Sequence, residues 1–309
     1  MLNSFNDVSA LARAGGVRRC AVPGATDEHA LEAVFAAQSA GYVEPVLLGP
    51  AAAVQQALER LGLNERPHRL VDTDNDSNPA EAAVELIRAQ EADFILKGGM
   101  QTRDLLKPVL NKQTGLNDQG FITHFGLMAI AGYPKLLAMS DAVVIPYPDL
   151  AAKIKIIQAC VAALAHLGNP APVIAALCAV ETVSDKMPET VDAASLAALG
   201  REGFFGPAKV LGPISYDLAT SPESVRIKQY PEPGAGAVDM LLVPQLVTGN
   251  VMSKIWNTDP ANSLAGCVIG ARVPIALVSR AASAREKLNS LILCCALSAP
   301  NPNQGVSHG

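Results

Sequence analysis

The sequence predicts an α/β protein with mainly parallel sheets and helices on both faces. Short apolar runs alternate with amphipathic segments along almost the whole chain of 309 residues, and this alternation is typical of parallel sheets. Half of the residues are hydrophobic and only 4% are aromatic, so Ala, Val, Leu and Ile must fill the core. In folds of this class, ligands bind outside the carboxyl ends of the strands.

The predicted elements follow one another from residue 19 onwards. Short apolar runs are interpreted as buried strands at residues 19–22, 45–48, 94–97, 142–145, 173–177, 209–211, 240–243 and 275–278. Helices are predicted to begin at Asp27, Pro50, Pro79, Thr102, Leu150, Val191, Thr248 and Ser283. The helix over residues 150–166 is supported both by the spacing of its apolar residues and by its Ala-rich composition.

Two stretches suit crossings between two lobes. Residues 132–134 read Gly-Tyr-Pro, and residues 266–274 run from one glycine to a proline. We therefore expect a first α/β lobe of residues 1–134 plus 270–309 and a second α/β lobe of residues 135–269. Residues 300–309 have no apolar face, and we expect them to fray.

Charge and targeting signals narrow the class of protein. The net charge of -5 argues against a nucleic-acid-binding surface. The N-terminus lacks the basic start and the apolar run of a secretory signal, and no apolar stretch approaches the roughly 20 residues that span a bilayer. We expect a soluble, cytoplasmic protein with no nucleic-acid or membrane partner.

The metal-binding residue types show no metal-binding pattern. The 6 cysteines form no C-x-x-C pair and lie mostly in apolar surroundings, which indicates buried, reduced thiols. The 5 histidines have no metal-ligand spacing. We expect no structural or catalytic metal.

The familiar nucleotide-binding and hydrolase motifs are absent. The chain has no P-loop, and residues 234–237, which read Gly-Ala-Gly-Ala, precede a predicted strand and therefore indicate a loop. It also has no G-x-S-x-G motif, so an α/β-hydrolase is not supported.

The turn after the predicted strand 94–97 is the first candidate site. Gly98 and Gly99 allow close approach of the backbone to a ligand, and Thr102 suits the N-cap of the next helix. Lys97 favours a site, because a buried lysine needs an anionic partner. The alternative is a tight turn before a capped helix, with no ligand.

A second strand-to-helix turn holds Thr248, Gly249 and Asn250. Backbone amides at such turns can hold an anion, Gly249 permits close approach, and Lys254 lies on the first turns of the predicted helix. The alternative is an N-cap followed by a solvated lysine.

A third turn begins with Ser279 and Arg280, directly after residues 274–278. An arginine can form two hydrogen bonds with one phosphate, and a serine hydroxyl can donate to a developing oxyanion. Ser283 and Glu286 have the spacing of a capping box, so Glu286 has a structural explanation as well as a chemical one.

Three other polar residues lie beside apolar runs. His124 is consistent with a satisfied core histidine or with a ligand contact. Asp141 and Asp217 either orient a site group or cap a turn.

Taken together and in this order, these segments resemble the phosphate acetyltransferase and phosphate butyryltransferase family. The similarity runs from about residue 20 to 297. The residues that carry it are Lys97, Gly98, Gly99 and Thr102; residues 105–112 with 115–116; Thr123 and His124; Ser140 and Asp141; Gly212, Pro213 and Asp217; residues 242–244 and 248–250 with Lys254; and Ser279, Arg280, Ser283 and residues 287–290. Residues 106–112, the Thr-His pair and the Lys-Leu-Asn-Ser ending are closer to the butyryl branch.

The resemblance implies a fold, a reaction and an assembly. The fold is a two-lobe, three-layer α/β/α architecture similar to isocitrate and isopropylmalate dehydrogenases, with the site in the cleft between the lobes. The reaction is reversible transfer of a short acyl group, acetyl or butyryl, between coenzyme A and inorganic phosphate, which gives an acyl phosphate. Coenzyme A is a substrate, no cofactor is expected, and the assembly is a homodimer or larger homo-oligomer.

The same resemblance assigns roles to residues. Arg280 holds phosphate, Ser279 stabilises the oxyanion, and Glu286 is the general base. The residues expected to bind phosphate or coenzyme A are Lys97, Gly98, Thr102, His124, Thr248, Gly249, Asn250, Lys254 and Ser283.

This chain departs from the family pattern at three positions. Asn117 stands where many butyryl-type relatives have arginine, Ala282 where they often have aspartate, and Arg285 where they have an acid. One alternative is therefore a family member that binds coenzyme A or acyl phosphate with weakened catalysis. Another is a metal-dependent NAD(P) dehydrogenase of the related fold.

Overall fold

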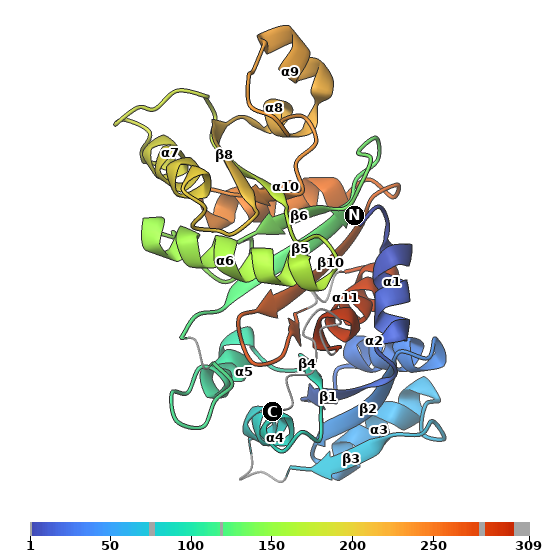
Figure 1. The fold of residues 1–309 in the computed structure, drawn as a ribbon. Helices are drawn as coiled ribbons and strands as arrows, with labels where there is room; N and C mark the ends of the chain where they lie inside the picture. The colour runs from blue at the N-terminus through green and yellow to red at the C-terminus, as the bar shows by residue number, and fades with distance from the viewer. Residues whose placement is uncertain (1, 74–77, 118–119, 278–281, 300–309) are drawn as a thin grey trace, which may run out of the picture. The chain divides into compact units, whose positions relative to one another are not determined.

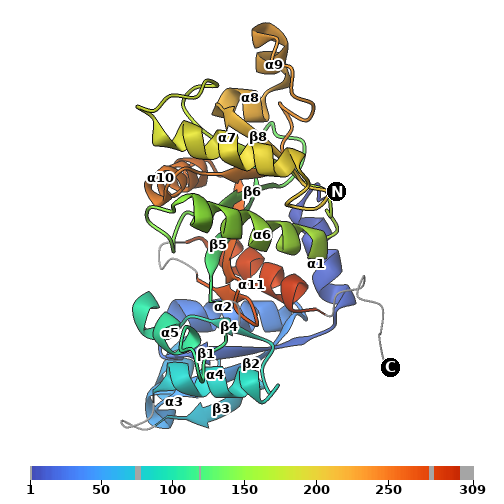
Figure 2. The same cartoon turned by 60° about the vertical axis from the view of Figure 1, so that its left-hand side comes forward.

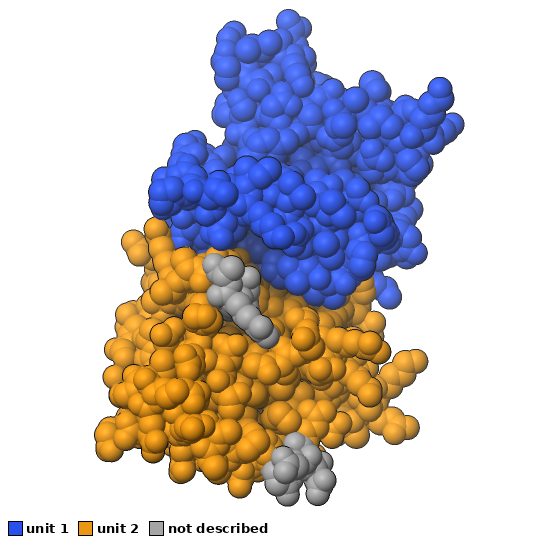
Figure 3. Space-filling model, turned by 180° about the vertical axis from the view of Figure 1, so that it is seen from behind, with its two compact units in different colours: residues 1–5, 123–264 blue, residues 6–122, 265–309 orange. Residues whose placement is uncertain are grey.

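The computed structural model describes residues 2–73, 78–117, 120–277 and 282–299. They form a mixed α/β fold that divides into two compact units, which Figure 3 colours separately. Unit 1 comprises Met1–Phe5 and Thr123–Leu264, and unit 2 comprises Asn6–Ile122 and Ala265–Gly309. The boundaries thus fall at 122/123 and 264/265, compared with 134/135 and 269/270 expected from the sequence.

Unit 2 contains a mostly parallel sheet with the strand order β3-β2-β1-β4-β11-β10. β1 pairs in parallel with β2 and β4, β2 with β3, and β4 with β11, whereas β10 and β11 are antiparallel. The strands are β1 (Arg18–Pro23), β2 (Val43–Gly49), β3 (Arg69–Asp72), β4 (Phe94–Leu96), β10 (Ser263–Ile269), which crosses the unit boundary, and β11 (Ile275–Ala276). The helices are α1 (Phe5–Ala14), α2 (Glu28–Ser39), α3 (Ala51–Leu61), α4 (Pro79–Arg88), α5 (Thr102–Val109) and α11 (Ala284–Ser298).

Unit 1 contains a sheet with the strand order β5-β6-β9-β7-β8. β6, β9, β7 and β8 are parallel to their neighbours, and only β5 pairs in the antiparallel sense, with β6. The strands are β5 (Thr123–Ala129), β6 (Leu137–Ser140), β7 (Val173–Leu177), β8 (Lys209–Ile214) and β9 (Met240–Leu242). The helices are α6 (Leu150–His166), α7 (Pro188–Arg201), α8 (Tyr216–Thr220), α9 (Pro222–Lys228) and α10 (Leu246–Asn257).

The helices of unit 1 cover both faces of its sheet. α6 and α7 lie side by side on one face (Figures 1 and 2). On the other face, Met252 and Trp256 of α10 pack with Val225 of α9 against a core that includes Met139 of β6 and Leu241 of β9. The connections β6-α6-β7 and β7-α7-β8 run in one direction along the sheet, whereas the connection from β8 to β9 runs back. Right-handed crossovers therefore place these connections on opposite faces.

Apolar side chains and reduced thiols fill the core of unit 2. All 6 cysteines of the chain are free and buried, as the sequence predicts. In unit 2 the Cys267 and Cys294 thiols are hydrogen-bonded, and Cys20 and Cys295 lie near Cys294. The expected small-hydrophobe role of these cysteines is confirmed.

Most predicted elements are present, and one predicted strand is wrong. Residues 142–144 form bends, residue 145 has no regular structure, and the strand of that region, β6, ends at Ser140. The Asp141 carboxylate accepts hydrogen bonds from the backbone N–H groups of Val143 and Val144, at 2.8 and 2.7 Å. These bonds hold a turn and keep this apolar run from pairing as a strand.

The element boundaries are less accurate than the elements themselves. β7 and α6 match their predicted ranges. α7 begins at Pro188 rather than Val191, and α10 begins at Leu246 rather than Thr248. The elements that the sequence does not predict are α1, α8, α9, β3, β5, β6 and β10. Across residues 2–73, 78–117, 120–277 and 282–299, none of the helices combines the length and the apolar character needed to cross a bilayer.

Candidate functional site

The turn after β4 is built by contact between two backbone segments. A Cβ atom at Gly98 would lie 2.4 Å from the Gly24 carbonyl oxygen and 2.7 Å from that of Pro23. The Gly98 N–H donates to the Pro23 carbonyl at 3.1 Å, and the Gly99 N–H donates to the Gly24 carbonyl at 2.7 Å. Gly98 is therefore explained by the neighbouring turn after β1, and no ligand is needed to account for it.

Lys97 is only half-buried, which corrects the expectation of a buried lysine that needs an anion. Its ammonium donates to the carbonyl oxygens of Gly98 and Met100, at 3.1 and 3.0 Å. Thr102 is the first residue of α5, but the N-cap is Gln101, so the predicted capping role of Thr102 is wrong.

Lys97 lies at the edge of the sheet of unit 2 where both β4 and β11 end. β4 and β11 are parallel neighbours, with Leu96 opposite Ala276, and the Lys97 N–H donates to the Ala276 carbonyl at 3.1 Å. The chain therefore leaves both strands at their carboxyl ends, where α/β proteins bind ligands. Ser279 and Arg280, which follow β11, lie outside the described residues.

The first turn of α11 has the predicted N-cap. Ser283 is the N-cap, and its hydroxyl accepts a hydrogen bond from the Glu286 N–H at 3.1 Å. The Ser290 hydroxyl donates to the Glu286 carbonyl at 2.9 Å and accepts from the Gly266 N–H at 3.0 Å. These bonds fix the backbone of Glu286, whose side chain is half-exposed.

Asn117, one of the departures from the family pattern, has a structural role. Its side-chain carbonyl accepts a hydrogen bond from the Phe121 N–H at 2.9 Å. This hydrogen bond gives Asn117 a structural role in the loop before β5.

In unit 1, His124 lies at the start of β5 beside a buried carboxylate. The Asp141 carboxylate accepts hydrogen bonds from the His124 N–H at 2.9 Å and from the Thr123 hydroxyl at 2.7 Å. The His124 side chain is buried, and its Nδ1 atom has no hydrogen-bond partner. Burial lowers the pKa of His124, and the charge of Asp141 offsets part of this effect. Asp141 thus orients the backbone of a candidate site residue and also holds a turn.

The predicted site residues on α10 lie on different sides of the helix. Thr248 lines a pocket, whereas Gly249 is buried and its Cβ would lie 3.0 Å from the Cβ of Ala142. The Asn250 side-chain amide donates to the Ala142 carbonyl at 3.3 Å. Lys254 is exposed on the last turn, not the first turns as predicted. Gly249 and Asn250 therefore attach α10 to the turn after β6.

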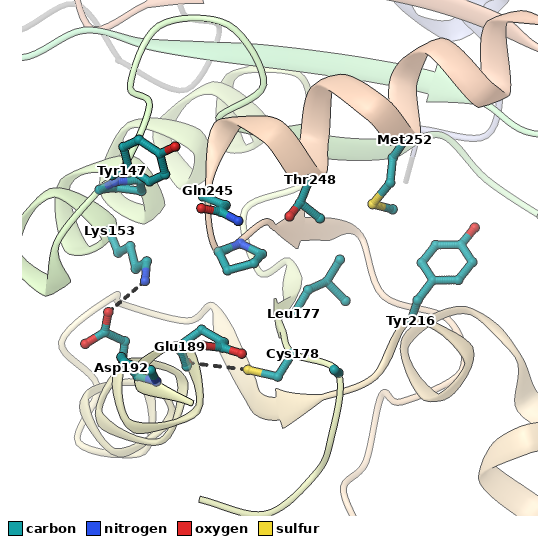
Figure 4. Close-up of a pocket in the computed structure, with 14 residues that line it drawn as sticks. Tyr147, Lys153, Leu177, Cys178, Glu189, Asp192, Tyr216, Gln245, Thr248 and Met252 are labelled. Carbon is teal, nitrogen blue, oxygen red and sulfur yellow. Dashed lines mark hydrogen bonds and ion pairs between the residues drawn. The ribbon is translucent and has the colours of Figure 1, made fainter. Parts of the chain in front are cut away.

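The pocket beside Thr248 lies within unit 1 and has a volume of about 570 Å³ (Figure 4). It lies at the carboxyl ends of β7 and β9, and the helices α6, α7, α8 and α10 also contribute to its walls. Its lining residues are Tyr147, Pro148, Lys153, Leu177, Cys178, Ala179, Pro188, Glu189, Asp192, Tyr216, Pro244, Gln245, Thr248 and Met252. Thr248 is the one lining residue among the predicted site residues.

The polar groups at one end of the pocket are paired with each other. The Lys153 ammonium lies 2.7 Å from an oxygen of Asp192, and the Lys153 side chain is only 7% exposed. The Cys178 thiol donates to the Glu189 carbonyl at 3.4 Å, and burial raises the pKa of this thiol to about 11. The pocket therefore offers neither an unpaired lysine nor a reactive thiolate.

The sequence contained one usable signal for this pocket. Residues at the carboxyl ends of β7 and β9 line the pocket. Both strands are predicted from the sequence, and ligands are expected at the carboxyl ends of such strands. Tyr147, Lys153 and Tyr216 were missed because no short motif marks them. In the described part of the chain, no group of three or more His, Cys, Asp or Glu residues is placed to hold a metal ion.

Comparison with known proteins identifies the family. Residues 70–295 match the family model described as phosphate acetyl/butaryl transferase. The chain belongs to this family. As a member of the phosphate acyltransferase family it is an enzyme, and the recognition based on sequence motifs is confirmed.

Individual relatives support the same assignment over nearly the full chain. The phosphate butyryltransferase of Clostridium acetobutylicum is 34% identical over 295 residues, which cover 95% of this chain and 97% of that protein. The phosphate acetyltransferase of Rhizobium meliloti is 35% identical over 299 residues, which cover 96% and 93%. Overall identity therefore does not separate the acetyl branch from the butyryl branch.

The fold matches solved structures of the same class. The branched-chain phosphotransacylase from Enterococcus faecalis superimposes with a TM-score of 0.82 and 27% identity, over 91% of this chain and 99% of that chain. A phosphotransacetylase from Streptococcus pyogenes, at 19% identity, superimposes with a TM-score of 0.79 over 96% of this chain and 99% of that chain, and it supports the fold alone.

Proposed function

We propose that this enzyme transfers a short acyl group, acetyl or butyryl, reversibly between coenzyme A and inorganic phosphate. The observation that carries the proposal is the family match over residues 70–295. Relatives similar over the full chain are phosphate butyryltransferases and phosphate acetyltransferases, which favours acyl transfer over the dehydrogenase alternative.

The reaction has three chemical requirements. Towards acyl-CoA, a base removes the thiol proton of coenzyme A, because a thiol with a pKa near ~8.5 is mostly protonated at neutral pH. The sulfur then attacks the acyl carbon of the acyl phosphate, a C–S bond forms, and the C–O bond to phosphate breaks. Cations and amides hold the phosphate, and a donor stabilises the oxyanion of the tetrahedral intermediate.

We assign these three roles to residues that follow β11 in the sequence. Arg280 holds phosphate, Ser279 donates to the oxyanion, and Glu286 acts as the general base. The assignment rests on the family resemblance and is supported by the capped start of α11, which fixes the backbone of Glu286 while leaving its side chain half-exposed. Direct transfer between the bound substrates requires no enzyme-bound nucleophile.

The remaining substrate contacts are proposed from both units. Lys97, Thr102 and Ser283 in unit 2 and His124 and Thr248 in unit 1 contact phosphate or coenzyme A. Gly98, Gly249, Asn250 and Lys254 complete the set inferred from the resemblance, although the first three have structural contacts of their own.

Several wider properties are part of the same proposal. The fold is of the isocitrate and isopropylmalate dehydrogenase type, and the location of the site in a cleft between lobes stays a prediction. The enzyme acts in the cytoplasm as a homodimer or larger homo-oligomer, and it uses no cofactor besides its substrate coenzyme A.

The proposal is tested by following phosphate-dependent release of the coenzyme A thiol from acetyl-, propionyl- and butyryl-CoA side by side. Arg280→Ala is expected to lose at least about a hundredfold in rate, since removal of one electrostatic contact to the transition state typically costs 10²–10³. Arg285→Ala removes an exposed arginine five positions further on and is the matched control.

The outcomes separate the alternatives. Wild-type rates in Arg280→Ala would refute the site assignment. Tight binding of coenzyme A by the wild type without thiol release from any acyl donor would favour the weakened family member.

A further inference from the structure

The pocket in unit 1 lies where the direction of chain winding reverses. α7 follows β7 on one face of the sheet, and α10 follows β9, the neighbouring strand, and packs on the other face (Figures 1 and 2). The ends of these two strands therefore diverge, and ligands of open α/β sheets bind in the crevice at such a switch point. Topology thus marks this pocket as a binding site, independently of any motif.

The size of the pocket excludes the acyl group as its sole occupant. Its volume of about 570 Å³ lies within the roughly 300–1,000 Å³ of pockets that enclose ligands of drug size. An acetyl or butyryl group has only a few heavy atoms and would leave most of this space empty. The pocket instead suits a larger part of a substrate.

The charges of the pocket exclude a phosphate group. Lys153 is the one cationic side chain among the lining residues, and its ammonium is already paired with Asp192 at 2.7 Å. A phosphate in this pocket would therefore lose water without gaining an unpaired cation. Of coenzyme A, this leaves the neutral adenine and the neutral pantetheine arm.

The opposite end of the pocket favours a flat aromatic ring. Tyr216 and Met252 line that end of the pocket, on the side of Leu177 away from Lys153 and Asp192 (Figure 4). The ring of Trp256, which is not among the lining residues, packs against that of Tyr216, with 6.1 Å between the ring centroids. A base stacks well on such a ring, and a thioether makes favourable contacts with aromatic groups.

Polar side chains are available for the edges of the ring. Gln245 and Thr248 line the pocket between its two ends (Figure 4), and an amide with a hydroxyl can donate to or accept from the ring nitrogens and amino group of a purine. The pantetheine arm is an aliphatic amide chain and has no planar ring to stack on Tyr216.

We propose that this pocket binds the adenine ring of coenzyme A, with Tyr216 stacked on the base. This inference rests on the proposed function, because it takes coenzyme A as the substrate. It adds a binding site within unit 1 whose residues take no part in the chemistry of acyl transfer.

The test compares acyl-CoA with the matching acyl-pantetheine, which has the same thioester but no nucleotide. Tyr216→Ala is expected to raise the KM for acyl-CoA about tenfold, as loss of one stacked base predicts, and to leave the KM for acyl-pantetheine unchanged. Tyr216→Phe keeps the ring and is expected to keep the wild-type KM. Phe204→Ala removes an aromatic ring that is 52% exposed and outside the pocket, and it is the matched control.

Two results would overturn the assignment while leaving the function intact. One is an unchanged KM for acyl-CoA in Tyr216→Ala. The other is an equal rise in KM for both substrates, which would indicate that the pocket holds the pantetheine arm or the acyl chain. Failure of the proposed function would look different, since the wild type would then transfer no acyl group at all. Titration of coenzyme A into the wild type and into Tyr216→Ala measures the two Kd values, which do not depend on turnover.

Discussion

Gly98→Ala is expected to destabilise unit 2 because the added methyl group meets backbone atoms. The new Cβ would lie 2.4 Å from one carbonyl oxygen and 2.7 Å from another, in the turn after β1. Such overpacking costs typically about 1–3 kcal/mol. The shift also strains the hydrogen bonds of Gly98 and Gly99 to Pro23 and Gly24, each worth about 1 kcal/mol. The total is about 2–5 kcal/mol.

Thermal unfolding measures this loss. In domains of 150–250 residues, each kcal/mol lowers the Tm by roughly 2–4 °C, so a drop of roughly 4–20 °C is expected. The control is Gly99→Ala, whose new Cβ would lie no closer than 3.4 Å to its neighbours. If Gly98→Ala and Gly99→Ala melted within a degree of each other, the contact between the two turns would not be what requires glycine at position 98.

Two further variants test the buried polar groups of unit 1. The Asp141 carboxylate accepts four hydrogen bonds. In Asp141→Asn, one carboxylate oxygen becomes an NH₂ group, which faces one pair of donors. The free energy of unfolding in urea is expected to fall by about 2–4 kcal/mol. Asp185→Asn, at an exposed aspartate, is the control. Equal urea midpoints for the two variants would contradict the prediction. For His124, burial lowers the pKa of the imidazole in the folded protein, so the unfolded chain binds a proton first as pH falls. The stability contributed by the neutral ring is therefore complete above about pH 6.5 and decreases as pH falls from there towards the lower pKa of the folded state. His124→Gln should show a flatter dependence between pH 7 and 5, and an unchanged slope would show that His124 does not titrate in this way.

The fold class and most buried elements could be predicted from the sequence because their signals are local. The apolar run that forms β7 and the Ala-rich helix α6 have the predicted bounds. The prediction failed at residues 142–145, where an apolar run is folded into a turn by the side chain of Asp141. That carboxylate competes with strand pairing through hydrogen bonds that no periodicity reveals.

Part of the candidate site could likewise be predicted from the sequence, and part could not. Family motifs marked the capped start of α11, and the structure confirms Ser283 as the N-cap. The glycine at position 98 was interpreted as space for a ligand, but it is explained by the turn after β1, a contact between residues some 75 positions apart. Tyr216 and Lys153 were missed because their neighbours in the pocket come from distant parts of the chain, and single residues on separate helices leave no pattern in sequence.

The burial of every cysteine has a practical consequence for measurement. The reagents that report a released coenzyme A thiol also react with accessible protein thiols, in proportion to the thiolate present. Here all 6 cysteines are buried, and burial raises the pKa of Cys178 to about 11 and that of Cys295 to about 12. The folded enzyme is therefore nearly silent towards such a reagent, so the colour that develops reports coenzyme A. A slow increase in signal without substrate would come from cysteines exposed in unfolded molecules. The same assay therefore also measures how much of a variant remains folded.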